Sequence, residues 1–151
     1  MANLRGAARS NYFSVRPELW DEFKTYCEFF DITIEEADTA PDGPILIHGG
    51  NTDTGTWPSW STKAKTPEFL AADIDTDFGA VEWKPLKQMP KYLCDDEVVI
   101  LVEAGNEKLR YVYGYAFAFN NKGKMVEIGT GQINDLAKTL TRNPDTLDLL
   151  P

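Results

Sequence analysis

The sequence predicts two adjacent β-strands over residues 97–119, which read EVVILVEAGNEKLRYVYGYAFAF. Residues 97–103 form a continuous apolar run between two glutamates, a pattern typical of a strand buried on both faces. Gly105 and Asn106 then predict a turn. From Leu109 to Phe119, large and mostly aromatic residues occupy the odd positions, and mostly small residues occupy the even ones. One face of this strand should therefore be aromatic, and a helix or a backbone could approach the small face closely.

Further strands and helices complete the predicted fold. Strands are predicted at residues 11–16, in both arms of a hairpin at 31–49, at 79–83 and at 124–128. Apolar residues at helical spacing predict helices over 17–30 and 133–140, and brief helical segments are expected at 67–72 and 85–94. Short turns between neighbouring strands favour antiparallel pairing. We therefore predict an α+β fold, with a single antiparallel sheet of five to six strands and two or three helices packed mainly on one face.

The length of 151 residues suits a single domain spanning 1–151. We expect flexible termini at 1–9 and 143–151 and a long irregular loop at 49–66, the kind of loop that is often functional. The two cysteines do not form a CxxC pair, and the sequence has neither a secretory leader nor an apolar run of about 20 residues. These features predict a cytoplasmic protein with reduced cysteines that does not enter a membrane.

Negative charge is concentrated early in the chain. Nine carboxylates and one lysine lie between Glu18 and Asp42, while the net charge of the whole chain is −9. Such a surface attracts basic proteins and repels phosphate backbones, so direct nucleic-acid binding is not expected. The alternative is a solvated helix face that keeps the protein soluble. The candidate partner-binding residues are Glu18, Asp21, Glu22, Glu28, Glu35, Glu36, Trp57 and Trp60.

The 49–66 loop offers a second candidate site. Trp57 and Trp60, with small polar neighbours, have the composition of a binding hot spot, although they could equally anchor the loop to the domain. In a ligand-binding alternative, the polar residues are His48, Asn51 and Asp53, and Trp57 covers the pocket. One histidine cannot by itself build a zinc site, and neither a GxSxG elbow nor a complete phosphate-binding loop is present. We assign no catalytic residue and no cofactor.

Three aspartates at alternate positions, Asp73, Asp75 and Asp77, resemble the start of a calcium loop. An EF-hand loop needs glycine at its sixth position and glutamate at its twelfth, where this chain has Phe78 and Lys84. A solvated acidic turn is the simpler interpretation. We assign no metal site, and cation binding by these aspartates stays an open question.

Two segments, SNYFSV at residues 10–15 and GNEKLRYVYGY at 105–115, resemble small uncharacterised proteins carried by bacteria, phages and plasmids. The resemblance implies a mobile-element origin and a role in host–element conflict or plasmid upkeep, and it transfers no catalytic residue. Anti-restriction and anti-CRISPR inhibitors form a comparison class because many of them are small and acidic.

Three functional hypotheses follow. The leading one is a non-enzymatic, acidic protein-binding module that engages a basic, nucleic-acid-handling partner. The second is a small-ligand-binding or enzymatic domain that uses the Gly49–Lys65 loop. The third is an oligomeric structural or accessory domain, since the sequence does not define the oligomeric state.

Overall fold

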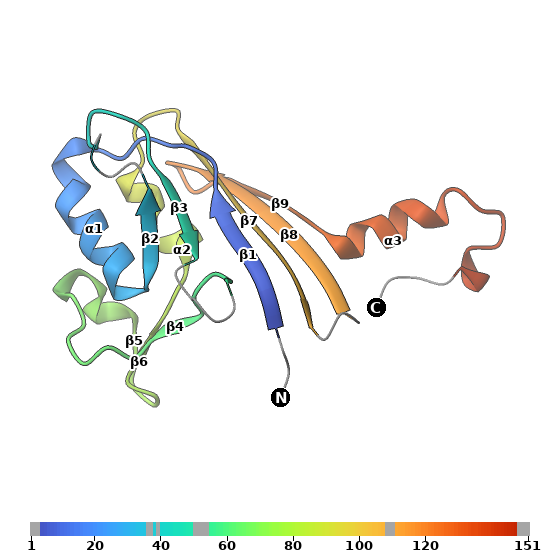
Figure 1. Cartoon of the computed structure of the whole chain (residues 1–151), viewed down its shortest axis with the longest axis horizontal. Coiled ribbons are helices and arrows are strands. Elements are labelled where there is room, and N and C mark those ends of the chain that lie inside the picture. The colour runs from blue at the N-terminus through green and yellow to red at the C-terminus, as the bar shows by residue number, and fades with distance from the viewer. Residues whose placement is uncertain (1–3, 36–37, 39, 50–54, 108–110, 148–151) are drawn as a thin grey trace.

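A computed structural model describes residues 4–35, 38, 40–49, 55–107 and 111–147. It has the predicted α+β fold, built on a six-stranded antiparallel sheet in the order β2-β3-β1-β7-β8-β9 (Figure 1). The strands of this main sheet are β1 Leu4–Ser10, β2 Ile32–Glu35, β3 Leu46–Gly49, β7 Val98–Glu107, β8 Tyr111–Asn120 and β9 Met125–Gly129.

The strands predicted from residues 97–119 form the longest pairing in the sheet. β7 and β8 pair from Val98 opposite Asn120 to Glu107 opposite Tyr111, and β9 continues the meander. The predicted hairpin at 31–49 is confirmed as the antiparallel pair β2 and β3. The predicted turn at Gly105 and Asn106 is wrong, because both residues lie in β7, opposite β8.

The N-terminal strand β1 differs most from the expectation. It pairs with β7 along its whole length and with β3 at Arg9, so it lies in the middle of the sheet. A flexible terminus over 1–9 is therefore wrong for residues 4–9. Residues 11–16 form isolated bridges at Phe13 and Val15 instead of a strand. β1 was missed because LRGAARS lacks the β-branched and aromatic residues typical of strands.

Helix α1, Trp20–Phe29, covers the inner face of the sheet and buries its apolar stripe, as predicted. Its first turn, Pro17–Leu19, is a separate 3-10 helix, η1. The buried residues of α1 meet Val99, Leu101 and Phe119 in one hydrophobic cluster. The remaining helices in the described ranges are η3 Glu68–Asp73, α2 Pro85–Gln88, η4 Pro90–Tyr92, α3 Thr130–Lys138 and η5 Pro144–Thr146. Of the predicted flexible C-terminus, residues 144–146 form η5, and 148–151 lie outside the described residues.

A second, small sheet is not expected from the sequence, although one of its strands lies within the short strand predicted at residues 79–83. It has the order β4-β6-β5 and consists of β4 Trp60–Ser61, β6 Ala80–Glu82 and β5 Ile74–Asp75. Part of the expected 49–66 loop is therefore regular structure. The Ser61 hydroxyl donates a hydrogen bond of 2.7 Å to the carbonyl of Phe29, which ties β4 to the end of α1.

The two faces of β7 have different surroundings. Val99 and Leu101 are fully buried on the inner face, whereas Val98, Ile100 and Val102 on the outer face are 40–44% exposed. The expectation of a strand buried on both faces is therefore wrong, because a continuous apolar run does not reveal how many faces are covered. The last helix, α3, does not cover the outer face but extends away from the body of the protein (Figure 1).

Candidate functional site

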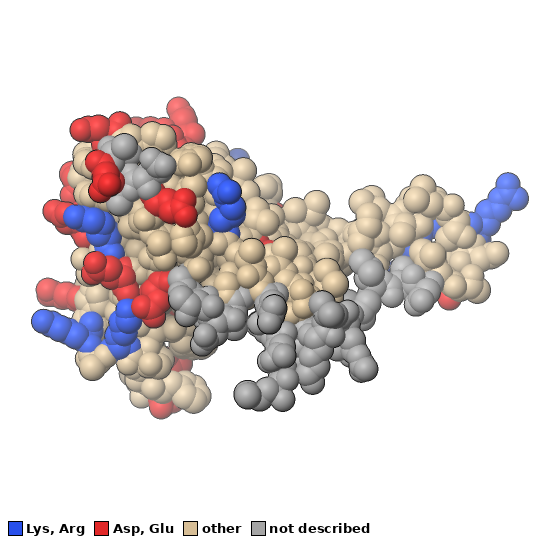
Figure 2. Space-filling model, viewed as in Figure 1, with Lys and Arg blue, Asp and Glu red and all other residues tan. Residues whose placement is uncertain are grey.

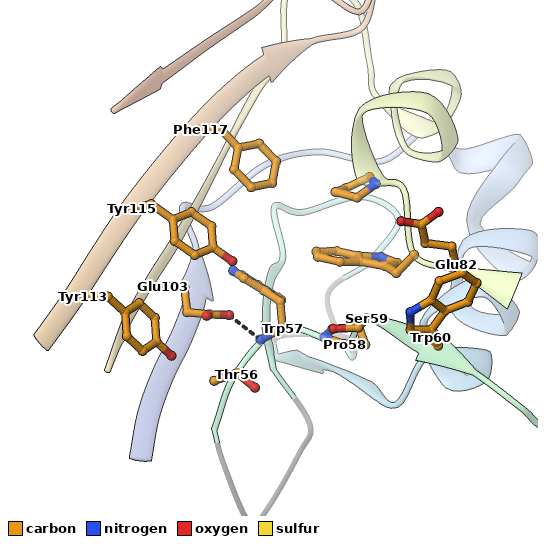
Figure 3. Close-up of a pocket in the computed structure, with 12 residues that line it drawn as sticks. Thr56, Trp57, Pro58, Ser59, Trp60, Glu82, Glu103, Tyr113, Tyr115 and Phe117 are labelled. Atoms are coloured by element: carbon orange, nitrogen blue, oxygen red, sulfur yellow. Dashed lines mark hydrogen bonds between the residues drawn. The ribbon is translucent and has the colours of Figure 1, made fainter. Parts of the chain in front are cut away.

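A cleft of about 540 Å³ lies between the inner face of β8 and the segment 56–60 (Figure 3). Its volume falls within the range typical of small-ligand pockets, about 300–1,000 Å³. Six aromatic side chains dominate its described lining: Trp57, Trp60, Trp83, Tyr113, Tyr115 and Phe117. Two glutamates, Glu82 and Glu103, also line it. The cleft therefore combines aromatic faces with carboxylate groups.

Strand geometry brings these groups together. Side chains at alternate positions share a face, so Tyr113, Tyr115 and Phe117 point the same way from β8. Glu103 lies directly opposite Tyr115 on β7 and joins that face. The aromatic row predicted for β8 thus has two roles, because Phe119 is fully buried in the core while the three residues before it line the cleft.

Glu103 is the central charged group of the cleft and is only 7% exposed. Its Oε2 atom accepts a hydrogen bond of 2.7 Å from the backbone N–H of Trp57. Burial, followed by the charge of Glu103 and a hydrogen bond to it, raises the pKa of Tyr115 to about 12 and also raises the pKa of Tyr113. No lysine, arginine or histidine whose side chain the structure describes forms an ion pair with Glu103.

The tryptophans of the cleft fall into two groups. Trp57 and Trp83 are buried and stack with ring centroids 5.5 Å apart, and the indole N–H of Trp57 finds no acceptor in the described part of the chain. Trp60 is 47% exposed at the edge of the cleft. Trp57 therefore acts as an anchor for its segment, and Trp60 presents its ring to solvent.

Small residues allow the chain to cross β1 just before Trp57. Gly55 has a φ of +67°, and a Cβ atom on it would lie 2.0 Å from the carbonyl oxygen of Gly6. A Cβ atom on Gly6 would in turn lie 3.0 Å from the methyl group of Thr56. The small residues of β1 do not predict a strand, but they make room for the segment that carries Trp57.

The acidic residues predicted to bind a partner lie mainly around α1 and β2, on one end of the molecule (Figure 2). Several of them contact cationic residues of the same chain. Asp21 pairs with Lys24 at 2.8 Å, and Glu22 pairs with Lys91 at 2.7 Å. Glu28 is exposed, and Glu36 lies outside the described residues. The negative surface is thus partly offset by the protein's own lysines.

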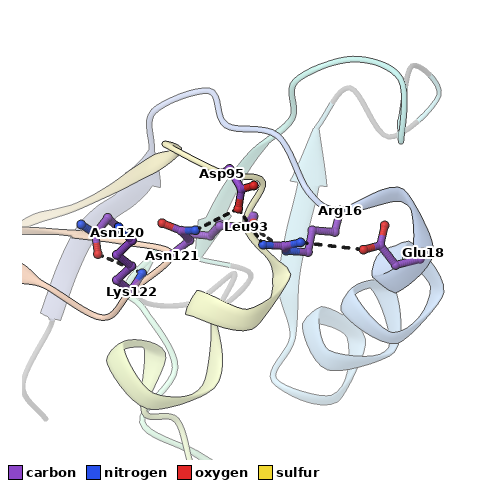
Figure 4. Close-up of polar contacts among 7 residues, drawn as sticks. All are labelled: Arg16, Glu18, Leu93, Asp95, Asn120, Asn121 and Lys122. Carbon is purple, nitrogen blue, oxygen red and sulfur yellow. Dashed lines mark hydrogen bonds and ion pairs between the residues drawn. The ribbon is translucent and has the colours of Figure 1, made fainter.

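Glu18 belongs to a polar network that joins the start of α1 to the hairpin of β8 and β9 (Figure 4). Arg16 lies 3.9 Å from Glu18 and 3.0 Å from Asp95, and its Nε atom donates to the carbonyl of Leu93. Asn121 also donates to Asp95. These side chains are exposed, so each ion pair should contribute about 0–1 kcal/mol to the free energy of unfolding.

Of the residues of the ligand-binding alternative, the structure describes His48 and Trp57, and only Trp57 is among the residues that line the cleft. His48 is half-buried on β3, with its Nε2 atom 3.1 Å from Glu35, a second predicted partner-binding residue. Asn51 and Asp53 lie outside the described residues, and Trp57 lines the cleft. Of this set, the structure therefore places Trp57 in a pocket.

Two of the three alternating aspartates, Asp73 and Asp75, have side chains with structural partners. Asp73 pairs with Lys87, and Asp75 accepts backbone N–H groups of Asp77 and Phe78. Within the described residues, no group of three or more histidine, cysteine, aspartate or glutamate side chains could hold a metal ion. In the same part of the chain, no helix has the length and apolar character needed to cross a membrane.

The sequence pattern does not single out Glu82, Trp83 or Glu103, and for the aromatic row that includes Tyr113 and Tyr115 it favours core packing over a ligand cleft. In the sequence Glu103 marks the polar end of the apolar run, although β7 continues past it to Glu107. A carboxylate on the aromatic face of a predicted strand pair was the available signal, but using it required the correct register between β7 and β8.

Comparison of the chain with protein-family models, with curated proteins and with solved structures finds no match.

Proposed function

We propose that this protein is a protein-binding module that captures a lysine or arginine side chain of a basic partner in the aromatic cleft. The observation that carries the proposal is Glu103, a buried carboxylate among aromatic rings with no cation from the described residues beside it. Buried charges in proteins are normally paired. A cationic group from a partner would supply a positive charge that the side chains described by the structure do not place beside Glu103.

The aromatic rings support the same ligand chemistry. Ammonium and guanidinium groups bind to the faces of tryptophan and tyrosine, with about 0.5–2 kcal/mol for each well-placed contact. The exposed ring of Trp60 and the carboxylate of Glu82 lie at the same cleft. Glu82 also pairs with Lys84 at 3.0 Å, so Glu103 is the stronger candidate for pairing with the bound cation.

A peptide suits the cleft better than a simple amine. The indole N–H of Trp57 finds no acceptor in the described part of the chain, and a buried orphan donor costs about 1–3 kcal/mol. A peptide brings carbonyl oxygens together with its cationic side chain. The net charge of −9 would attract a basic protein over a longer range, and we include nucleic-acid-handling proteins in the proposed partner class.

Titration of tryptophan fluorescence tests this function, because three of the four tryptophans line the cleft. The probes are a short poly-arginine peptide, a neutral glycine–serine peptide of equal length, and arginine amide as a free cation. We expect the poly-arginine peptide to bind and the neutral peptide not to bind. Binding of arginine amide as tightly as the peptide would instead indicate a small-molecule site. Failure of both cations to bind would overturn the proposal.

Two charge-matched variants identify the binding surface. Glu103→Gln removes the charge in the cleft, and Glu28→Gln removes one charge from the exposed face of α1. Glu103→Gln should lose about 2 kcal/mol of binding free energy, which weakens peptide binding about 30-fold. Glu28→Gln should bind the peptide nearly as tightly as the wild type does. Trp60→Ala, at an exposed edge position, is a second test that should not unfold the protein. The opposite pattern, with weak binding in Glu28→Gln alone, would favour the acidic helix face.

A further inference from the structure

The outer face of β7, β8 and β9 forms an apolar surface that the described chain leaves uncovered. The register places Ile100 opposite Ala118, Val102 opposite Ala116, and Ala116 next to Ile128 on β9. Val112, Val126 and Ile128 are 63–71% exposed. We call this surface, defined by Ile100, Val102, Val112, Ala116, Val126 and Ile128, the outer sheet face. A soluble protein rarely leaves such a continuous patch in water without a partner.

Helix α3 is a second uncovered apolar surface. It begins at Thr130, directly after β9, and extends away from the body of the protein (Figure 1). Ile133 and Leu136 of α3, and Leu140 two residues after its end, recur at helical spacing and are 51–89% exposed, and no residue of α3 is buried. An amphipathic helix of this kind normally packs its apolar stripe against another surface.

The two surfaces fit each other. Small residues of β8, Gly114, Ala116 and Ala118, lie on the outer side of the sheet, whereas α3 presents branched side chains. An apolar hollow of about 340 Å³ lies where they meet, lined by Val102, Ala116, Ile128 and Ile133 among others. A helix stripe from another molecule can therefore pack on this face.

The protein exposes more surface than a compact chain of its size. The whole chain exposes 9927 Å², whereas a compact protein of 17.0 kDa exposes about 7,700 Å², and α3, none of whose residues is buried, contributes to the difference. For comparison, one subunit of an obligate dimer buries about 1,000–2,500 Å². Residues 78–151, which supply both surfaces, contain ten acidic and nine basic residues, so two copies can meet there without strong repulsion.

We infer that two copies of this chain form a symmetric dimer in which α3 of each copy packs on the outer sheet face of the other. Both halves of the contact come from the same chain, so a two-fold axis satisfies the helix and the sheet face of both copies at once. This surface differs from the aromatic cleft, which opens on the inner face of β8, and the inference does not depend on the proposed function.

Sedimentation equilibrium and light scattering test the inference on the full chain. We expect a mass of twice 17.0 kDa that persists on dilution to micromolar concentration. A mass of 17.0 kDa at every concentration would overturn the inference and leave the face to a different partner.

Variants of both surfaces separate the dimer from a folding defect. Leu136→Lys on α3 and Val126→Lys on β9 change side chains that are 61% and 71% exposed, so the monomer should still fold. Each should convert the dimer to a monomer. Asp135→Asn makes the same change in net charge as Leu136→Lys at the neighbouring helix position, and it should stay dimeric. Persistence of the dimer in either lysine variant, with an unchanged circular dichroism spectrum, would overturn the inference.

Discussion

At the scale of single residues, Glu103 connects parts of the chain that are distant in sequence. It accepts a hydrogen bond from the backbone N–H of Trp57, 46 residues away, and it helps to raise the pKa of Tyr113 and Tyr115 on the neighbouring strand. The carboxylate therefore holds the 55–57 segment against the sheet while it faces the cleft. Both roles follow from its position opposite Tyr115, on the inner face of β7.

The position of Glu103 opposite Tyr115 predicts how Tyr115 ionises. Burial is the main reason that the pKa of Tyr115 is raised to about 12, and the charge of Glu103 is the second. Glu103→Gln should therefore lower the pKa of Tyr115 toward its usual value without restoring it fully. An ultraviolet titration of tyrosinate absorbance, compared with Glu28→Gln, measures the shift. Identical titration curves for Glu103→Gln and the wild type would contradict the assignment.

The same pKa predicts how stability depends on pH. The folded state binds the Tyr115 proton more tightly than the unfolded state, whose pKa is near the ordinary value of 10.0. Its contribution to the free energy of unfolding is complete below pH 10 and is lost as the pH rises toward about 12. Urea unfolding over this range should show falling stability, with a shallower fall in Glu103→Gln. The buried tyrosines Tyr26 and Tyr92, whose pKa values are also raised, should maintain part of the fall in both proteins.

At the scale of elements, the crossing of residues 55–57 over β1 depends on glycine. Gly55 and Gly79 both have positive φ values, +67° and +60°, but a Cβ atom on Gly79 meets nothing within 4 Å. Gly79→Ala should lower the free energy of unfolding by about 1–2 kcal/mol, because a residue with a Cβ atom is disfavoured in the left-handed conformation. Gly55→Ala should lower the free energy of unfolding by about 1–3 kcal/mol more than Gly79→Ala does, because the new Cβ atom would collide with the carbonyl oxygen of Gly6. Urea denaturation measures both, and equal losses would show that the crossing is not tightly packed.

Elements with strong local patterns could be predicted from the sequence, and elements defined by tertiary contacts could not. Long periodic segments predicted α1, β7 and β8 because their apolar spacing alone specifies the element. The strand β1 and the two-residue strands β4 and β5 depend on partners from distant parts of the chain. The cleft was missed for the same reason, since Trp57 and Glu103 meet only after the sheet has formed. Trp57 and Trp60 could be predicted as candidates because tryptophans among small polar residues are recognisable within one short stretch of sequence.

At the scale of the whole molecule, the chain separates two kinds of surface. The acidic residues gather around α1 and β2, while α3 and the outer sheet face belong to the nearly neutral second half. The aromatic cleft lies on the opposite side of β8 from the outer sheet face. A dimer formed through α3 would therefore leave both clefts free for a partner.

This separation predicts opposite responses to salt. Raising the ionic strength from 0.1 M to 1 M shortens the screening length from about 10 Å to about 3 Å, so binding of the poly-arginine peptide should weaken at least about tenfold. The dimer contact is apolar, and its dissociation constant should stay constant or fall, because salts that are excluded from protein surfaces favour apolar burial. Fluorescence titration and sedimentation equilibrium on the same samples measure the two constants. A dimer that dissociates in parallel with the loss of peptide binding would show that both contacts are electrostatic, and the apolar interface would have to be abandoned.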